Sequence, residues 1–214
     1  GHNGFTVENG VLYDKDKVVL ITYPAGKTDA SFSVPSTVET IGSYAFFRNK
    51  YIVSVSFPER VYDSTDSTKI DISGLSEIES YAFYGAYELT AVIIPNVTTS
   101  VESYAFAYGA KLANITFGTN YTTINPHTFE GCTAIVDLII PETVKVIDEY
   151  AFYDCTGMKT LVIGSKVEEI GENAFVNCLN HGKDTNGNTI AKVFYYGTSD
   201  DWFRFYSNGV DSTN

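Results

Sequence analysis

Apolar side chains recur along this chain at a fixed interval of 23 residues. The dipeptide Ala-Phe, once replaced by Thr-Phe, begins at Ala45, Ala82, Ala105, Thr128, Ala151 and Ala174. Four of the five spacings are 23 residues, and the first is 37, which is 23 plus an insertion of 14. A fixed period of this length indicates stacked structural repeats rather than one irregular core.

Other apolar positions keep the same register. Four residues before each Ala-Phe stand Ile41, Ile78, Val101, Ile124, Ile147 and Ile170, and seven residues after its Ala stand Ile52, Leu89, Leu112, Ile135 and Met158. Each repeat also contains a largely apolar triplet that is followed directly by Pro or Gly. These triplets begin at Phe32, Val55, Val92, Ile115, Leu138, Leu161 and Phe194. Their β-branched, alternating composition predicts short strands.

The segment around Ala-Phe, such as Gly42–Phe47, is long enough only for a single 3₁₀ or α turn. One such unit buries too little apolar surface to offset the entropy of ordering its backbone, so the units have to stack. We therefore predict a repeat solenoid with a parallel β-sheet on one face and short 3₁₀ or α turns on the other.

Residues 138–158 read Leu-x-Ile-Pro-x-x-Val-x-x-Ile-x-x-x-Ala-Phe-x-x-Cys-x-x-Met. With Leu in the final position, this pattern resembles the BspA-type leucine-rich repeat, a family of bacterial surface proteins with 23-residue units. The resemblance covers about residues 31–197. It implies a leucine-rich-repeat fold, an extracellular or cell-surface location, and binding or adhesion without catalysis. We expect no signal peptide at the Gly-His-Asn-Gly start of the sequence.

The repeats divide the chain into three parts. We expect an N-terminal capping β-hairpin over residues 1–30, repeats over 31–197 with insertions near 59–72 and 180–190, and a C-terminal cap and polar tail over 198–214. Both ends of a parallel sheet need covering. For the first repeat this cover is predicted to come from Phe5, Val7, Val11, Tyr13 and Val18–Ile21, and for the last from Trp202 and Phe203.

Four departures from the repeat predict less regular packing. Thr98 and Tyr121 stand in the Val column, Thr128 stands in an Ala position, and an insertion falls at about 59–72.

Charge excludes two classes of partner. The 214 residues include 14 basic and 26 acidic side chains, so the formal net charge is 14 − 26 = −12. No Lys/Arg cluster offsets this charge, which argues against binding to nucleic acid or to an anionic membrane surface. No apolar run approaches the roughly 18 residues of a membrane-spanning helix, so no membrane insertion is expected. A cationic or cation-bridged partner is favoured.

The three cysteines, Cys132, Cys155 and Cys178, occupy one column at separations of 23 residues. Stacked repeats place their Cα atoms about 5 Å apart, within reach of a disulfide. We interpret them as a column of small buried thiols, and the formation of a disulfide between two of them stays open. Zinc is disfavoured because no Cys-x-x-Cys pair is present.

No other motif indicates a cofactor, a metal or catalysis. The histidines are His2, His127 and His181, and His127 stands in a column that otherwise holds Tyr or Asn. No Ser or Cys has a plausible base and an orienting carboxylate tied to it. The segments Asp63–Asp66 and Asp184–Asn188 lack the Gly and Glu of a calcium loop, so we interpret them as turns. The column Tyr44, Tyr81, Tyr104 and Tyr150 predicts an aromatic ladder.

The outward face of the predicted sheet is the candidate binding surface. Alternation along the strands gives the face residues Ile93, Asn114, Thr116, Asp137, Ile139, Thr160, Val162 and Tyr195. Six or seven strands at about 4.8 Å span roughly 30 Å, enough for a standard contact of about 800 Å² per partner. We expect a monomeric module that binds a host or matrix protein or a glycan. The alternatives are a structural spacer within a larger surface protein, and glycan binding through the tyrosines.

Overall fold

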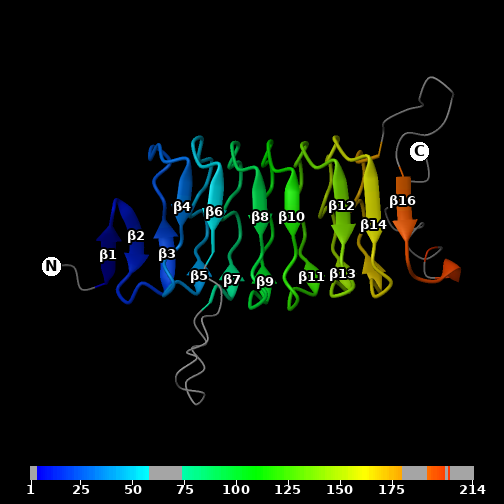
Figure 1. Ribbon diagram of the computed structural model, residues 1–214, viewed down its shortest axis with the longest axis horizontal. Coiled ribbons are helices and arrows are strands. Elements are labelled where there is room, and N and C mark those ends of the chain that lie inside the picture. Colours follow the sequence, from blue (N-terminus) through cyan, green and yellow to red (C-terminus); the bar gives the residue numbers. More distant parts are fainter. Residues whose placement is uncertain (1–3, 58–73, 180–191, 201, 203–214) are drawn as a thin grey trace, which may run out of the picture.

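The computed structural model describes residues 4–57, 74–179, 192–200 and 202, and these residues form an elongated solenoid (Figure 1). The chain winds through about six turns with almost no helix. The predicted parallel β-solenoid is confirmed.

Two rows of parallel strands follow the long axis. The long-strand row contains β4 (Ser31–Ser33), β6 (Ser54–Ser56), β8 (Ala91–Ile93), β10 (Asn114–Thr116), β12 (Asp137–Ile140), β14 (Thr160–Ile163) and β16 (Lys192–Tyr195). The short-strand row contains β5 (Thr40–Ile41), β7 (Glu77–Ile78), β9 (Ser100–Val101), β11 (Thr123–Ile124), β13 (Val146–Ile147) and β15 (Glu169–Ile170). The short-strand row was not predicted, because a strand of two residues has no readable alternation.

The N-terminal cap is a three-stranded antiparallel unit rather than a single hairpin. β1 (Phe5–Glu8) pairs with β2 (Val11–Asp14), and β2 pairs with β3 (Val19–Thr22), which then runs parallel to β5. Val11, Tyr13 and Leu20 are buried and cover the first repeat as expected. The expectation was wrong for Phe5 and Val7, which are 62 % and 68 % exposed, because β1 lies beyond β2 and away from the repeats.

At the other end, Trp202 packs on Tyr195 with ring centroids 5.8 Å apart. Phe203, the predicted polar tail and the two predicted insertions lie outside the described residues.

The core consists of columns that repeat once per turn. Phe83 stacks on Phe46 with centroids 4.5 Å apart, and the stack continues with nearly parallel rings through the Phe of every later repeat. Tyr23 of the cap extends this stack by lying 4.9 Å from Phe46. The apolar residue four positions before each Ala-Phe is also fully buried. The 23-residue period therefore becomes a set of continuous apolar columns along the axis.

The Ala-Phe segment forms hydrogen-bonded turns rather than a helical turn. In the first repeat, Tyr44 and Arg48 have φ values of 61° and 51°. Residues at the equivalent positions of the later repeats are left-handed as well. Alternate amides therefore point along the axis: the N–H of Phe46 donates to the carbonyl of Ala82 in the next repeat, while the N–H of Phe47 donates back to Tyr44. A left-handed conformation costs a non-glycine residue roughly 1–2 kcal/mol, which the inter-repeat hydrogen bonds offset.

Both rows are interrupted in the repeat that contains Tyr121. The ladder β8–β10 does not continue into β12, and the ladder that ends at β9 does not continue into β11. In neighbouring repeats the N–H of Asp148 donates to the carbonyl of Ile124, but here the side-chain amide of Asn125 donates to the carbonyl of Val101 at 2.8 Å. The less regular packing predicted for Tyr121 is found at this point, whereas Thr128 keeps the backbone hydrogen bonds of its Ala counterparts.

The side chain of Tyr121 can be tested at this interruption of the two rows. This side chain is fully buried, and its hydroxyl makes no hydrogen bond within 3.5 Å among the described residues, although the backbone of Asn125 and the side chain of Thr128 interact with it at longer range. Because a buried, unsatisfied hydroxyl costs about 1–3 kcal/mol, we expect Tyr121→Phe to raise the free energy of unfolding by about 1 kcal/mol, measured by urea denaturation.

Tyr23→Phe is the matched control, because the hydroxyl of Tyr23 is placed to donate to Asp29 at 3.3 Å. It should leave stability unchanged or lower it. A loss of stability in Tyr121→Phe as large as that in the control would show that the Tyr121 hydroxyl has a partner after all.

Candidate binding surface

Seven of the eight predicted face residues point outward from the long-strand row. Ile93 and Ile139 are 61 % and 64 % exposed. Asn114, Thr116 and Asp137 are exposed as well, while Thr160 and Val162 are partly exposed. Strand pairing aligns Thr116 with Ile93 in β10 and β8, and Val162 with Ile139 in β14 and β12. One column on this surface contains Ile93, Thr116, Ile139 and Val162. A second column beside it contains Asn114, Asp137 and Thr160.

The prediction was wrong for the eighth residue, Tyr195, which does not lie on the outer face. β16 pairs with β14 so that Phe194 is opposite Val162, and Tyr195 is opposite the buried Ile163. Tyr195 therefore points inward and packs against the core, and Phe194, 47 % exposed, takes its place on the outer face. The register could not be read from the period because extra residues precede this strand.

The outer face has a polar half and an apolar half. In β4 and β6 the outward residues are serines, and the hydroxyl of Ser56 donates to that of Ser33 at 3.0 Å. In β12, β14 and β16 the corresponding residues are Ile139, Val162 and Phe194, which lie side by side on three hydrogen-bonded strands. We name these three residues the apolar stripe.

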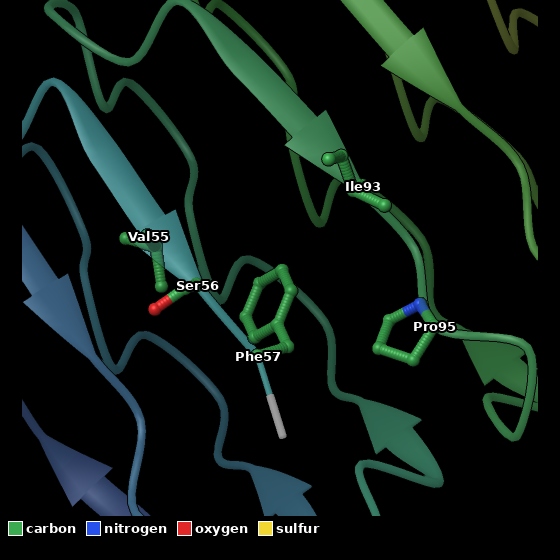
Figure 2. Close-up of a pocket in the computed structure, with 5 residues that line it drawn as sticks. All are labelled: Val55, Ser56, Phe57, Ile93 and Pro95. Carbon is green, nitrogen blue, oxygen red and sulfur yellow. The ribbon is translucent and has the colours of Figure 1, made fainter. Parts of the chain in front are cut away.

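A shallow pocket of about 210 Å³ opens between β6 and β8 (Figure 2). Val55, Ser56 and Phe57 line it on the β6 side, and Ile93 and Pro95 line it on the β8 side. β6 and β8 do not share a ladder, so the outer sheet parts at this place. Its walls are mostly apolar, and Ile93 at the rim links the pocket to the rest of the outer face.

The tyrosine column forms a continuous stack along a different side of the repeats. Tyr44, Tyr81 and Tyr104 lie with centroids 5.0 and 4.8 Å apart and planes within 5° of parallel. His127 continues the stack between Tyr104 and Tyr150, at 4.3 and 4.9 Å. We name these five residues the aromatic ladder. Each inner ring has both faces covered by its neighbours, which leaves those faces closed to a stacked sugar.

A buried carboxylate beside this ladder was missed from the sequence. Glu130 occupies a column that holds Phe47, Tyr84 and Tyr153 elsewhere, and it is only 9 % exposed. One of its oxygens lies 2.7 Å from His127 Nδ1, and the other accepts a hydrogen bond from the Tyr108 hydroxyl. That hydrogen bond, together with burial, raises the pKa of Tyr108 above its usual range. The signal in the sequence was a charged residue in a column whose other members, Ala107 and Val176 included, are aromatic or aliphatic.

The three cysteines form one column of buried, free thiols. Each donates from Sγ to the carbonyl of a Phe in the preceding repeat: Cys132 to Phe106, Cys155 to Phe129, and Cys178 to Phe152. Burial raises the pKa of Cys132 to about 12, so at neutral pH it is a protonated hydrogen-bond donor rather than a nucleophile.

Within the described part of the chain, no group of His, Cys, Asp and Glu side chains is arranged to hold a metal ion. The segments Asp63–Asp66 and Asp184–Asn188 lie outside that part. No helix among the described residues is long and apolar enough to cross a membrane.

Residues 27–68 and 61–182 match the sequence profile of the BspA type leucine-rich repeat region, in six copies. No curated protein sequence matches the chain significantly.

Three solved structures share the fold. A leucine-rich repeat protein from Eubacterium ventriosum has a TM-score of 0.67 and 24 % identity over 90 % of this chain and 48 % of its own. A leucine-rich repeat protein from T. pallidum has a TM-score of 0.60 and 20 % identity over 81 % of this chain and 85 % of its own. A leucine-rich cell surface protein from Faecalibacterium prausnitzii has a TM-score of 0.57 and 23 % identity over 99 % of this chain and 44 % of its own. The chain thus spans about half the length of the first and third of these proteins.

Proposed function

The chain belongs to the BspA-type leucine-rich repeat family, and from that premise we propose that it is a non-catalytic binding or adhesion module of the bacterial cell surface. Its partner docks on the outer face of the long-strand row. The family consists mainly of scaffolds without enzymatic activity, and a solved relative of the same fold is a cell surface protein. Both support a role in recognition.

Exposed β-branched side chains on a regular sheet are the observation that carries this proposal. Ile93 and Ile139 keep more than half of their surface in water, although a scaffold sheet would be expected to carry polar residues there. With the apolar stripe and the pocket beside β6, they give a surface that is apolar at several points and polar around them. This composition is typical of a protein interface, where an apolar centre is enclosed by a polar rim.

A protein partner fits this surface better than a glycan does. Sugars bind to aromatic ring faces, and the inner rings of the aromatic ladder are already covered by each other. The outer face offers aliphatic side chains, a pocket and the serines of β4 and β6 instead. The net charge of −12 favours a partner surface with cationic groups around its apolar contacts.

Ile93→Asp combined with Ile139→Asp tests the proposal. We expect the double variant to fold and melt like the parent, because both side chains are exposed. Its binding to the extracellular-matrix protein that the parent captures from a purified panel should weaken by at least tenfold, because a charge would enter the centre of the contact. Surface plasmon resonance measures the affinity, and calorimetry checks the fold.

Ala110→Asp combined with Thr156→Asp is the matched control. It adds the same charge at two exposed positions away from the long-strand row, so binding should be retained. Equal binding by both double variants would contradict the outer-face proposal and favour the spacer alternative. Selective binding of the parent on a glycan array, unaffected by either variant, would favour the glycan alternative.

A further inference from the structure

The aromatic ladder contains two pairs of tyrosines in direct ring contact. Tyr81 is stacked on Tyr44 with centroids 5.0 Å apart and planes 2° from parallel, and on Tyr104 with centroids 4.8 Å apart and planes 5° from parallel. The stack places the hydroxyl-bearing rings of successive repeats next to each other. Among the described residues, Tyr81 is therefore the one tyrosine of the ladder that is stacked on a tyrosine on both sides.

An oxidant that reaches this surface meets tyrosines before other oxidisable side chains. Tyr44 is 53 % exposed, whereas Met158 and the three thiols have no exposed surface. Oxidation of Cys and Met follows their exposure, so the phenols of the aromatic ladder are the accessible electron donors in this region.

Glu130 supplies a proton acceptor next to the ladder. A phenol that loses an electron has to lose its proton as well, and the Tyr108 hydroxyl already donates to the Glu130 carboxylate. The ring of Tyr108 lies 5.2 Å from that of Tyr84, which lies 5.6 Å from Tyr81. These contacts connect Tyr108 to the ladder, so an electron from Tyr81 can refill an oxidised Tyr108.

We propose that the aromatic ladder is a site of oxidative cross-linking, at which a peroxidase-type oxidant couples Tyr81 to Tyr44 or to Tyr104. Each phenol loses one electron and one proton, and the two resulting radicals join through a carbon–carbon bond between ring Cε atoms. In each coupled ring the bonded Cε then gives up a proton and the oxygen takes up a proton, which restores the phenol. In total, one hydrogen peroxide and two tyrosines give one dityrosine and two waters. The product is a covalent link between successive repeats.

Peroxidase and hydrogen peroxide, applied to the full chain at high dilution, test this proposal. We expect dityrosine fluorescence in the monomer fraction, a loss of two hydrogen atoms per cross-link, and linked peptides that contain Tyr81 with Tyr44 or Tyr104. Tyr81→Phe keeps the stacked ring but cannot form a phenoxyl radical, so both linked peptides should disappear. Tyr51→Phe removes an exposed tyrosine outside the ladder, and it should leave both linked peptides in place.

A variant that adds a tyrosine to the aromatic ladder provides a second, independent test of the proposal. His127→Tyr would extend the run of tyrosines through to Tyr150, so new linked peptides should join position 127 to Tyr104 or Tyr150. The proposal is overturned if oxidised parent monomers contain no cross-link at Tyr81, if dityrosine forms only between chains, or if Tyr81→Phe retains the parent yield. Failure of the His127→Tyr variant to form new links, while it melts like the parent, would also count against it.

Discussion

Replacement of Phe106 by alanine is expected to lower the free energy of unfolding by about 3–5 kcal/mol. Phe106 is 1 % exposed and stacks between Phe83 at 5.1 Å and Phe129 at 5.5 Å. Removing the ring leaves a cavity in the middle of a continuous column, and both neighbours lose a stacking partner. Denaturation in urea, followed by circular dichroism, measures the effect.

The position of Phe106 in the third repeat should also change the shape of the transition. In a solenoid each repeat is stabilised by its neighbours, so weakening one in the middle separates the two flanking blocks. We expect a broader transition than that of the parent. Phe194→Ala is the control, since it removes the same ring from a position that is 47 % exposed and should cost less than about 1 kcal/mol. A similarly small cost for Phe106→Ala would mean that the assignment of inward and outward positions is wrong.

Alkaline pH is expected to unfold the chain from pH 9 upward. Burial raises the pKa of Cys132 from 9.0 to about 12, and burial also raises the pKa of Cys155 well above its usual value. The folded chain therefore favours the neutral thiol, whereas the unfolded chain ionises near pH 9. This contribution to stability is fully present below pH 9 and is lost between pH 9 and about 12. A rise of about three units corresponds to about 4 kcal/mol for Cys132 alone.

Thermal melting as a function of pH measures this loss. Below pH 9 the thiols should add no slope, and above it the melting temperature should fall steeply. Cys132→Ala should fall less steeply between pH 9 and 12, because one titrating group is gone, and the column already accepts Ala86 at an equivalent position. Identical slopes in parent and variant would show that the Cys132 thiol titrates equally in both states. The tyrosines Tyr23 and Tyr121, whose pKa values burial also raises, add to the fall only above pH 10.

The buried columns were predictable because the repeat period fixes their register. Once Ala45 and Ala151 are known to be equivalent, Ile41 and Ile147 have to share one environment, and both are fully buried. The same argument predicted the thiol column and the outward direction of Ile93 and Ile139. A period carries this information only while it stays unbroken.

Tyr195 was wrongly predicted on the outer face because the residues before β16 depart from the 23-residue period. Val193 to Tyr196 is an apolar run that gives no clear alternation, so either phase is compatible with a strand. The usable signal was Lys192, a polar residue that pairs with the outward Thr160. Aligning these two positions would have put Phe194 on the outer face.

The left-handed turns were not predicted because tyrosine has no preference for positive φ. Tyr44, Tyr81 and Tyr104 adopt it because inter-repeat hydrogen bonds and ring stacking hold them there. Asn173 at the equivalent position, and Gly85 and Gly131 three residues after the Ala or Thr of their repeats, were the sequence hints. The sequence did not indicate the pocket beside β6, because the pocket depends on the separation between β6 and β8.

The direction of the inter-repeat hydrogen bonds has a mechanical consequence. They run along the long axis, from Phe46 to Ala82 and from Phe83 to Ala105, for example, and β1 and β16 lie at opposite ends of that axis (Figure 1). A pull between the two ends therefore opens these bonds a few at a time, instead of shearing many at once. Each 23-residue repeat that detaches releases about 80 Å of chain. A module tethered at one end and loaded at the other would lengthen repeat by repeat, and so limit the force that reaches its attachment.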